Sequence, residues 1–423
     1  MRENFLHYLW KYQKFDVRQL KTVQDELINI VSVGSHNHNS GPDFFNAKLR
    51  IGAQLWAGNV EIHIKSSDWY VHHHEQDIAY DNVILHVVYE HDANVFRKDN
   101  STIPTLELKH YINAKILHKY YDLFSNTSKW INCEKDFSKT EDFTLNHWLE
   151  RLYFERLEQK SKAIEDLLKT SKNNWEAVLF ILLTKNFGLK VNAEAFFSLA
   201  KSIDFSVIRK SQPKLLALEA LLFGQAGLLE KDIEDSYYLK LKNEYAFLKQ
   251  KFQLSNDYVT PLQFFRLRPS NFPTIRLSQL ANLYHKESNL FSKILSSSTL
   301  EDFYTLFEVA ASAYWKTHYT FNNTSKTRDK VLTKSFADLL LINTIIPVKF
   351  CYAKQKGEND NQQIIDIIRA IKPEKNTIVN GFNNLKNVTN SALESQAFVQ
   401  LKTEYCNKHQ CLKCAIGNSL LNK

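Results

Sequence analysis

The spacing of apolar residues changes along this chain, and each change restricts the secondary structure that can form. Residues 43–109 alternate apolar and polar side chains in four segments separated by turn residues, which predicts β-strands. From about residue 140 the apolar residues recur every three or four positions, which predicts helices. Residues 3–31 show the helical spacing too, so we expect two short helices there. The pattern predicts an α+β chain: an N-terminal mixed α/β sheet domain, then a large all-helical region.

Length and composition indicate the number of domains and the class of protein. A chain of 423 residues exceeds one typical hydrophobic core, and the changes of pattern divide it into residues 1–135, 136–300 and 301–423. Its 10 glycines and 8 prolines are too few for long disordered regions. It has no run of about 18 apolar residues, and its five cysteines are too few for a disulfide framework. We therefore expect a cytoplasmic protein that does not enter a membrane.

Charge is distributed unevenly between the front and the rear of the chain. Residues 1–134 contain 14 Lys and Arg against 16 Asp and Glu, whereas the remainder contains 40 against 30. A basic helical region suits a polyanionic partner such as nucleic acid. A Lys-rich, solvated helical surface explains the same excess without any partner.

Residues 36–91 concentrate ionisable side chains among segments that should be buried. Eight of the fifteen histidines lie between His36 and His91. Buried ionisable groups are costly unless they are paired or bind a ligand, so this region is the candidate site. On a strand covering residues 55–65, Glu61, His63 and Lys65 share one face, and the apolar residues between them point to the other.

A hairpin would bring a further carboxylate to this strand. Asp43 begins the preceding strand, directly after a proline. A turn midway between the two strands places Asp43 opposite Ile64, with His63 and Lys65 on either side. We therefore take Asp43, Glu61, His63 and Lys65 as the catalytic candidates.

This arrangement resembles the core of the PD-(D/E)XK nucleases, through Asp43 after its proline and the strand with Glu61 and Lys65. In that family the carboxylates hold Mg²⁺ and the lysine orients or activates the attacking water. The resemblance implies a restriction-endonuclease-like sheet in which Asp43 and Glu61 bind Mg²⁺ or Mn²⁺. The sequence departs from the family pattern because His63 stands in the lysine position, and Lys65 lies two residues further along. Glu26, on the expected second helix, is a further candidate metal carboxylate.

A second group of imidazoles comes after this strand, at His72, His73, His74 and His86. His72 and His74 share one face of an extended chain, and imidazoles combined with carboxylates suit Zn²⁺, Mn²⁺ or Fe²⁺. The spacing matches no established metal-binding motif. His86 lies within an apolar strand, where a core histidine with satisfied hydrogen bonds explains it.

The C-terminus contains a compact group of potential metal ligands: Cys406, His409, Cys411 and Cys414. A CxxC pair with a third cysteine five residues earlier is typical of a metal-binding knuckle. With His409 as the fourth ligand, the group would bind Zn²⁺. With Cys133 instead, it resembles nucleases that hold an iron–sulfur cluster through one upstream cysteine and a C-terminal trio. An unligated, cysteine-rich helix start is the alternative.

Three arginines in the helical region suggest contacts with nucleic acid. Arg266, Arg268 and Arg276 flank a proline-containing turn with interleaved aromatic residues, a pattern that can contact phosphates and stack on bases. The same arginines can equally cap helix ends.

Nearly the whole chain resembles an uncharacterised bacterial family, one of the domain-of-unknown-function families. The segments that carry this resemblance are GPDF, VEIH, SSDW, the HxH at 72–74, NVILHVV, LLFGQAGLL, RLRPSNFPTIR and the cysteine-rich end. The family resemblance implies no activity. Three functions stay open: a divalent-metal-dependent nuclease or phosphodiesterase, a non-catalytic nucleic-acid-binding or assembly protein with a degenerate nuclease-like core, and a His/carboxylate transition-metal enzyme acting on a small molecule.

Overall fold

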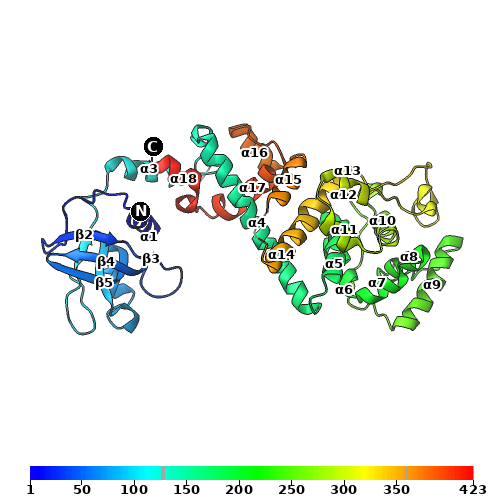
Figure 1. The fold of residues 1–423 in the computed structure, drawn as a ribbon, viewed down its shortest axis with the longest axis horizontal. Helices are drawn as coiled ribbons and strands as arrows, with labels where there is room; N and C mark the ends of the chain where they lie inside the picture. The colour runs from blue at the N-terminus through cyan, green and yellow to red at the C-terminus, as the bar shows by residue number, and fades with distance from the viewer. Residues whose placement is uncertain (125–128, 359–360, 423) are drawn as a thin grey trace. The chain divides into compact units, whose positions relative to one another are not determined.

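The computed structural model describes residues 1–124, 129–358 and 361–422 (Figure 1). It confirms the α+β class, because the main sheet lies within the first 107 residues and helices dominate the described residues after it. The chain forms two compact units: unit 1 contains residues 1–148 and 401–423, and unit 2 contains residues 149–400. The division into residues 1–135, 136–300 and 301–423 stays a prediction.

The described part of unit 1 is built on a mixed sheet with strand order β1-β2-β4-β5-β6-β7, and β3 pairs with β4. The pairs from β1 to β5 are antiparallel, whereas β5, β6 and β7 are parallel. The strands are β1 (Leu20–Lys21), β2 (Leu27–Ser32), β3 (Ser35–His36), β4 (Phe44–Ile51), β5 (Gln54–Lys65), β6 (Val83–Glu90) and β7 (Thr105–Glu107). The four strands predicted between residues 43 and 109 are thus confirmed.

Four α-helices lie wholly within the described residues of unit 1, namely α1 (Glu3–Tyr12), α2 (Asp68–Val71), α3 (Ala114–Phe124) and α18 (Ala415–Asn422). The expected first helix is present, and α1 packs against β5. The expected second helix is wrong, since those residues form the hairpin of β1 and β2. Its turn holds Asp25 in the left-handed region at φ 70°, and β-branched residues favour the extended strand after this turn.

Strand β5 separates two environments because its side chains alternate between the faces of the sheet. Val60 and Ile62 are fully buried in the main apolar core, together with residues of α1, β4 and β6. Glu61 and His63 point to the opposite face, where Trp69 and Tyr80 belong to a smaller apolar cluster. The alternation that placed the polar residues on one face of this strand is therefore confirmed.

Gly58 allows β5 and β6 to approach each other closely next to Glu61 and His63. A Cβ atom at this position would lie 2.5 Å from Ile84 Cγ2 and 2.7 Å from the Asn82 carbonyl oxygen. We expect Gly58→Ala to lower the free energy of unfolding by about 1–3 kcal/mol, as overpacked sites do. Thermal and denaturant unfolding measure this change. The neighbouring, exposed Ala57→Ser is the control. Equal stability of the two variants would contradict the steric argument.

Unit 2 is helical throughout most of its described residues, as the three- and four-residue spacing predicted. The helices are α4 (Asp142–Thr170), whose first residues belong to unit 1, α5 (Trp175–Phe187), α6 (Leu189–Lys201), α7 (Phe205–Ser211), α8 (Leu215–Gln225), α9 (Ser236–Phe252), α10 (Pro273–Lys286), α11 (Leu290–Ser296), α12 (Leu300–Leu306), α13 (Lys334–Leu340), α14 (Ile346–Lys356), α15 (Gln362–Ala370), α16 (Thr377–Leu385) and α17 (Ala392–Gln400). A short hairpin of β8 (His318–Thr320) and β9 (Asn323–Thr324) interrupts them.

One continuous helical stretch, Lys334–Lys356, is long and apolar enough to cross a membrane by length and composition. It comprises α13, a π-helical turn and α14. Most of its apolar window is buried inside the protein, and the Lys349 ammonium within it donates to three backbone carbonyls. Such burial is typical of the core helix of a globular unit.

Candidate metal centre

Asp43 and Glu61 meet at the junction of β4 and β5. The Asp43 backbone N–H donates to Glu61 Oε2 at 3.1 Å. In return, the Ile62 N–H donates to Asp43 Oδ2 at 3.0 Å. These reciprocal hydrogen bonds fix two carboxyl groups that are eighteen positions apart in the sequence.

The expected strand register is wrong by about three residues. Ile51 pairs with Gln54 at the turn, and Phe44 pairs with Val60, so Asp43 lies opposite Glu61 and not Ile64. A β-bulge between Phe44 and Ala47 inserts an extra residue into β4. Asn46 within it adopts a left-handed conformation at φ 57°. The tight turn moves the expected register by two residues and the bulge by one more, and together they bring Asp43 opposite Glu61.

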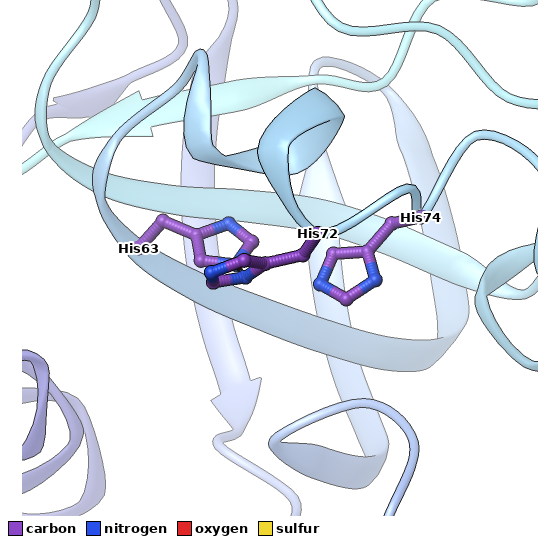
Figure 2. Close-up of side chains that lie close together, drawn as sticks. All are labelled: His63, His72 and His74. Carbon is purple, nitrogen blue, oxygen red and sulfur yellow. Dashed lines mark hydrogen bonds between the residues drawn. The ribbon is translucent and has the colours of Figure 1, made fainter.

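Three imidazoles gather beside Glu61, and Figure 2 shows His72 and His74 extending toward His63 from the loop after α2. One nitrogen from each of these histidines lies within 4.8 Å of the others. Glu61 Oε1 lies 3.3 Å from His74 Nε2 and 3.5 Å from His63 Nε2. The loop reverses at His73, which has a φ of 59°. The chain is therefore not extended at these residues. His72 and His74 nevertheless face the same site.

The ring of His63 is held from both sides. Its Nδ1 lies 2.8 Å from His86 Nε2, and its Nε2 lies 3.0 Å from His72 Nδ1. His86 is completely buried in β6, and its Nδ1 has no hydrogen-bond partner within the described part of the protein. His86 is therefore incompletely satisfied as a core residue, and it supports the ring that faces the cluster.

Burial favours the uncharged forms of Glu61, His63 and His86. Burial, reinforced by the charge of Asp43, raises the pKa of the Glu61 carboxyl. Burial and the neighbouring imidazoles lower the pKa of His63 to about 2. The same causes lower the pKa of His86 to about 3. Neutral imidazoles close to an acidic group match what a metal ion requires, since it binds deprotonated nitrogens and can displace the carboxyl proton.

Helix α1 adds two ionisable residues that the sequence reasoning missed. His7 Nε2 lies 3.2 Å from Asp43 Oδ2. Although burial favours its neutral form, the hydrogen bond and charge of Asp43 raise the pKa of His7. Burial, followed by the charge of Asp43, raises the pKa of Glu3. Glu3 and His7 are four residues apart on one helix, so their shared face could have been recognised from spacing.

Lys65 and Glu26, two of the candidates predicted from the sequence, lie apart from this cluster. Lys65 has an exposed side chain at the end of β5, two residues beyond His63. His63, which takes the lysine position of the nuclease pattern, is 1% exposed. Glu26 is exposed in the turn between β1 and β2, because the helix expected to carry it does not form. The structure therefore groups Asp43, Glu61, His63, His72 and His74, together with His7.

Comparison of the sequence with known families identifies a family for the chain but assigns no activity to it. A family described as "Protein of unknown function (DUF2851)" matches residues 3–377. The chain belongs to this family. No curated protein matches the chain, and no solved structure does. The DUF2851 match contains every residue of the histidine and carboxylate cluster and ends before the C-terminal cysteines.

The C-terminal ligand candidates lie in unit 1. Cys411 and Cys414 are buried and Cys406 is partly buried. His409 is exposed, adopts a left-handed conformation at φ 53°, and places Nδ1 3.2 Å from Asn132 Oδ1.

The three arginine candidates lie in unit 2 and differ in exposure. Arg266 and Arg268 are exposed. Arg276 is 7% exposed and donates to Gln279 Oε1 at 2.8 Å and to Asn271 Oδ1 at 2.7 Å. Its guanidinium holds the turn against α10 and is not presented to solvent, which opposes the expected contact of Arg276 with nucleic acid.

Proposed function

We propose that this protein hydrolyses phosphodiester bonds in nucleic acid with a divalent metal ion bound by Asp43, Glu61, His63, His72 and His74. The observation that carries the proposal is the junction of β4 and β5. There, two carboxyl groups joined by reciprocal backbone hydrogen bonds lie against three imidazoles. This junction reproduces the pairing of carboxylates on which the resemblance to PD-(D/E)XK nucleases depends.

The ligand atoms favour a transition metal over Mg²⁺. Imidazole nitrogens combined with carboxylate oxygens suit Mn²⁺, Fe²⁺ or Zn²⁺, whereas Mg²⁺ prefers oxygen ligands and water. When bound, such an ion would polarise a phosphoryl oxygen and lower the pKa of an attacking water. His72 is the exposed member of the three imidazoles, so we place the approach of the substrate on its side of the cluster.

The charge distribution supports a nucleic-acid substrate. Unit 1 contains 20 Lys and Arg and 20 Asp and Glu, whereas unit 2 contains 34 against 26. The net positive charge therefore belongs to unit 2, where Arg266 and Arg268 are exposed beside the exposed Phe265. Exposed cationic side chains can contact the phosphates of a nucleic acid, and exposed aromatic rings can stack on its bases.

Two observations favour other functions. The replacement of the nuclease lysine by His63 favours a non-catalytic nucleic-acid-binding or assembly protein with a degenerate core. The excess of imidazoles over carboxylates favours a transition-metal enzyme that acts on a small molecule. Salt-sensitive binding of nucleic acid without cleavage would support the first alternative, and metal binding without affinity for nucleic acid would support the second.

The decisive experiment incubates the full chain with single- and double-stranded DNA and RNA in the presence of Mn²⁺, Zn²⁺ or Mg²⁺. Wild type should cleave at least one of these substrates with Mn²⁺ or Zn²⁺, and Asp43→Asn should not. Asp25→Asn is the matched control, because Asp25 is an exposed carboxylate in unit 1 that pairs with Lys21. Equal cleavage by wild type and Asp43→Asn, or no cleavage by wild type, would overturn the proposal.

The buried contact between His86 and His63 gives a further prediction. His86→Phe keeps a planar ring in the core but removes the nitrogen that contacts His63 Nδ1. We expect Mn²⁺ or Zn²⁺ affinity to fall by about 10–100-fold, as changes to outer-shell partners of metal ligands do. Calorimetric titration measures it, and the exposed His118→Phe is the control. Unchanged affinity in His86→Phe would show that this contact does not orient a metal ligand.

A further inference from the structure

Four of the five cysteines belong to unit 1, although they come from two segments far apart in the sequence. Cys133 precedes α4, and the other three lie between the end of unit 2 and α18. The fifth, Cys351, is buried in α14 of unit 2. All five lie in the described part of the chain and none forms a disulfide.

Contacts join the two cysteine-bearing segments. The Lys402 ammonium donates to the Trp130 carbonyl oxygen at 2.9 Å. Asn132 Oδ1 lies 3.2 Å from His409 Nδ1, and the same side chain hydrogen-bonds the Cys411 thiol. Cys133 packs against the apolar core cluster that includes Cys411. The residues before Cys133 therefore run alongside the residues that carry the C-terminal cysteines.

The C-terminal segment folds back on itself around its cysteines. A 3₁₀ turn covers Cys411–Lys413, and the Cys414 N–H donates to the Cys411 carbonyl at 3.2 Å. The His409 N–H donates to the Cys406 carbonyl at 3.1 Å, which closes the preceding turn. Gly417 packs so closely that a Cβ atom there would lie 2.2 Å from the Cys411 carbonyl oxygen. This tight packing fixes the CxxC turn against the start of α18.

Three of these thiols have other thiols of the group close enough to shift their pKa. Burial, followed by the neighbouring Cys414 and Cys411 thiols, raises the pKa of Cys133. Burial raises the pKa of Cys406, and so do the neighbouring thiols of Cys414, Cys133 and Cys411. Burial and Cys414 raise the pKa of Cys411 to about 12. Cys133, Cys406, Cys411 and Cys414 are therefore neighbours of one another in unit 1.

We propose that Cys133, Cys406, Cys411 and Cys414 together bind a metal centre that fastens the C-terminal segment to the rest of unit 1. Four cysteine thiolates hold either a tetrahedral Zn²⁺ or an iron–sulfur cluster. His409 is not a ligand, because its ring is exposed and contacts Asn132. The centre is independent of the proposed hydrolytic site and would bridge the two sequence segments that flank unit 2.

The test measures metal in the full chain, purified without oxygen, by elemental analysis and ultraviolet–visible absorption. It uses a His63→Ala/His74→Ala background, so that metal at the histidine cluster does not contribute. Stoichiometric zinc, or iron with the broad absorption of a cluster, is expected in this background and identifies the occupant. Cys133→Ser and Cys411→Ser should lose it, whereas Cys351→Ser and His409→Gln should keep it.

A thiol measurement keeps the proposal testable even where a serine variant fails to fold. The folded His63→Ala/His74→Ala protein is treated with a chelator, and its thiols are counted with a disulfide reagent. Four more thiols should react rapidly as the metal is released. Absence of metal, metal retained in a folded Cys133→Ser variant, or metal lost in His409→Gln would overturn the proposal. Loss of nuclease activity in any of these proteins does not bear on it.

Discussion

Glu61→Gln is expected to abolish metal-dependent cleavage and to weaken Mn²⁺ or Zn²⁺ binding by more than about 100-fold, the upper end of what outer-shell changes cost. Glu61 has the central place among the ligands. One oxygen accepts from the Asp43 N–H at 3.1 Å, and the other lies 3.3 Å from His74 Nε2. A glutamine keeps a carbonyl oxygen that can accept from Asp43, so the strand pairing should survive while the negative charge is lost.

Glu26→Gln is the matched control for this substitution. Glu26 is an exposed carboxylate in the same unit, in the turn between β1 and β2. Cleavage rates, metal titrations and thermal unfolding should be unchanged in Glu26→Gln. In Glu61→Gln the unfolding temperature should stay near that of wild type while activity and affinity fall. Full activity in Glu61→Gln would exclude this carboxyl from the metal centre.

Metal binding should also release a proton that comes from Glu61. The pKa of this carboxyl is raised by burial and by Asp43, whereas His63, with a pKa lowered to about 2, has no proton to lose at neutral pH. Affinity should therefore rise with pH through the neutral range, because the proton must leave before the carboxylate binds a cation. Calorimetry in buffers of different ionisation enthalpy counts the released protons. Equal release by wild type and Glu61→Gln would assign the proton to another group.

The sequence predicted the parts of this site that depend on local periodicity. Alternation along residues 55–65 correctly put Glu61 and His63 on one face, because a strand has no other way to arrange its side chains. The same reasoning failed at residues 20–32, where apolar residues fit a helical spacing and β-branched residues still favoured a hairpin. Glu26 was misplaced for that reason.

The contacts that the sequence did not predict depend on tertiary structure. The partner of Asp43 was misjudged for two reasons: the turn after Ile51 comes earlier than expected, and a bulge at Asn46 shifts the register by one more residue. Bulges leave little trace in an apolar pattern. The contact between His7 and Asp43 depends on how α1 packs against β5. Likewise, the meeting of His72 and His74 with His63 depends on the left-handed turn at His73.

The site is expected to prefer Mn²⁺, Fe²⁺ or Zn²⁺ over Mg²⁺ by at least about 100-fold in affinity, because three of its five proposed ligands are imidazoles. The three ring nitrogens within 4.8 Å of one another are close enough to share one ion after small side-chain rotations. Competition titrations of the metal-free protein against a fluorescent chelator measure these affinities, in a Cys133→Ser/Cys411→Ser background that lacks the proposed cysteine centre. His72→Ala/His74→Ala should remove most of the preference for transition metals, and the exposed His118→Ala should not change it.

The metal preference also separates the proposed functions from one another. Tight Mn²⁺ binding that supports cleavage of nucleic acid would favour the nuclease. Tight Zn²⁺ or Fe²⁺ binding without cleavage would instead favour a small-molecule substrate. Equal affinity for Mg²⁺ and Mn²⁺, unchanged in His72→Ala/His74→Ala, would show that the imidazoles do not bind metal. The centre would then rest on Asp43 and Glu61, with the histidines serving to neutralise and pack a buried carboxyl group.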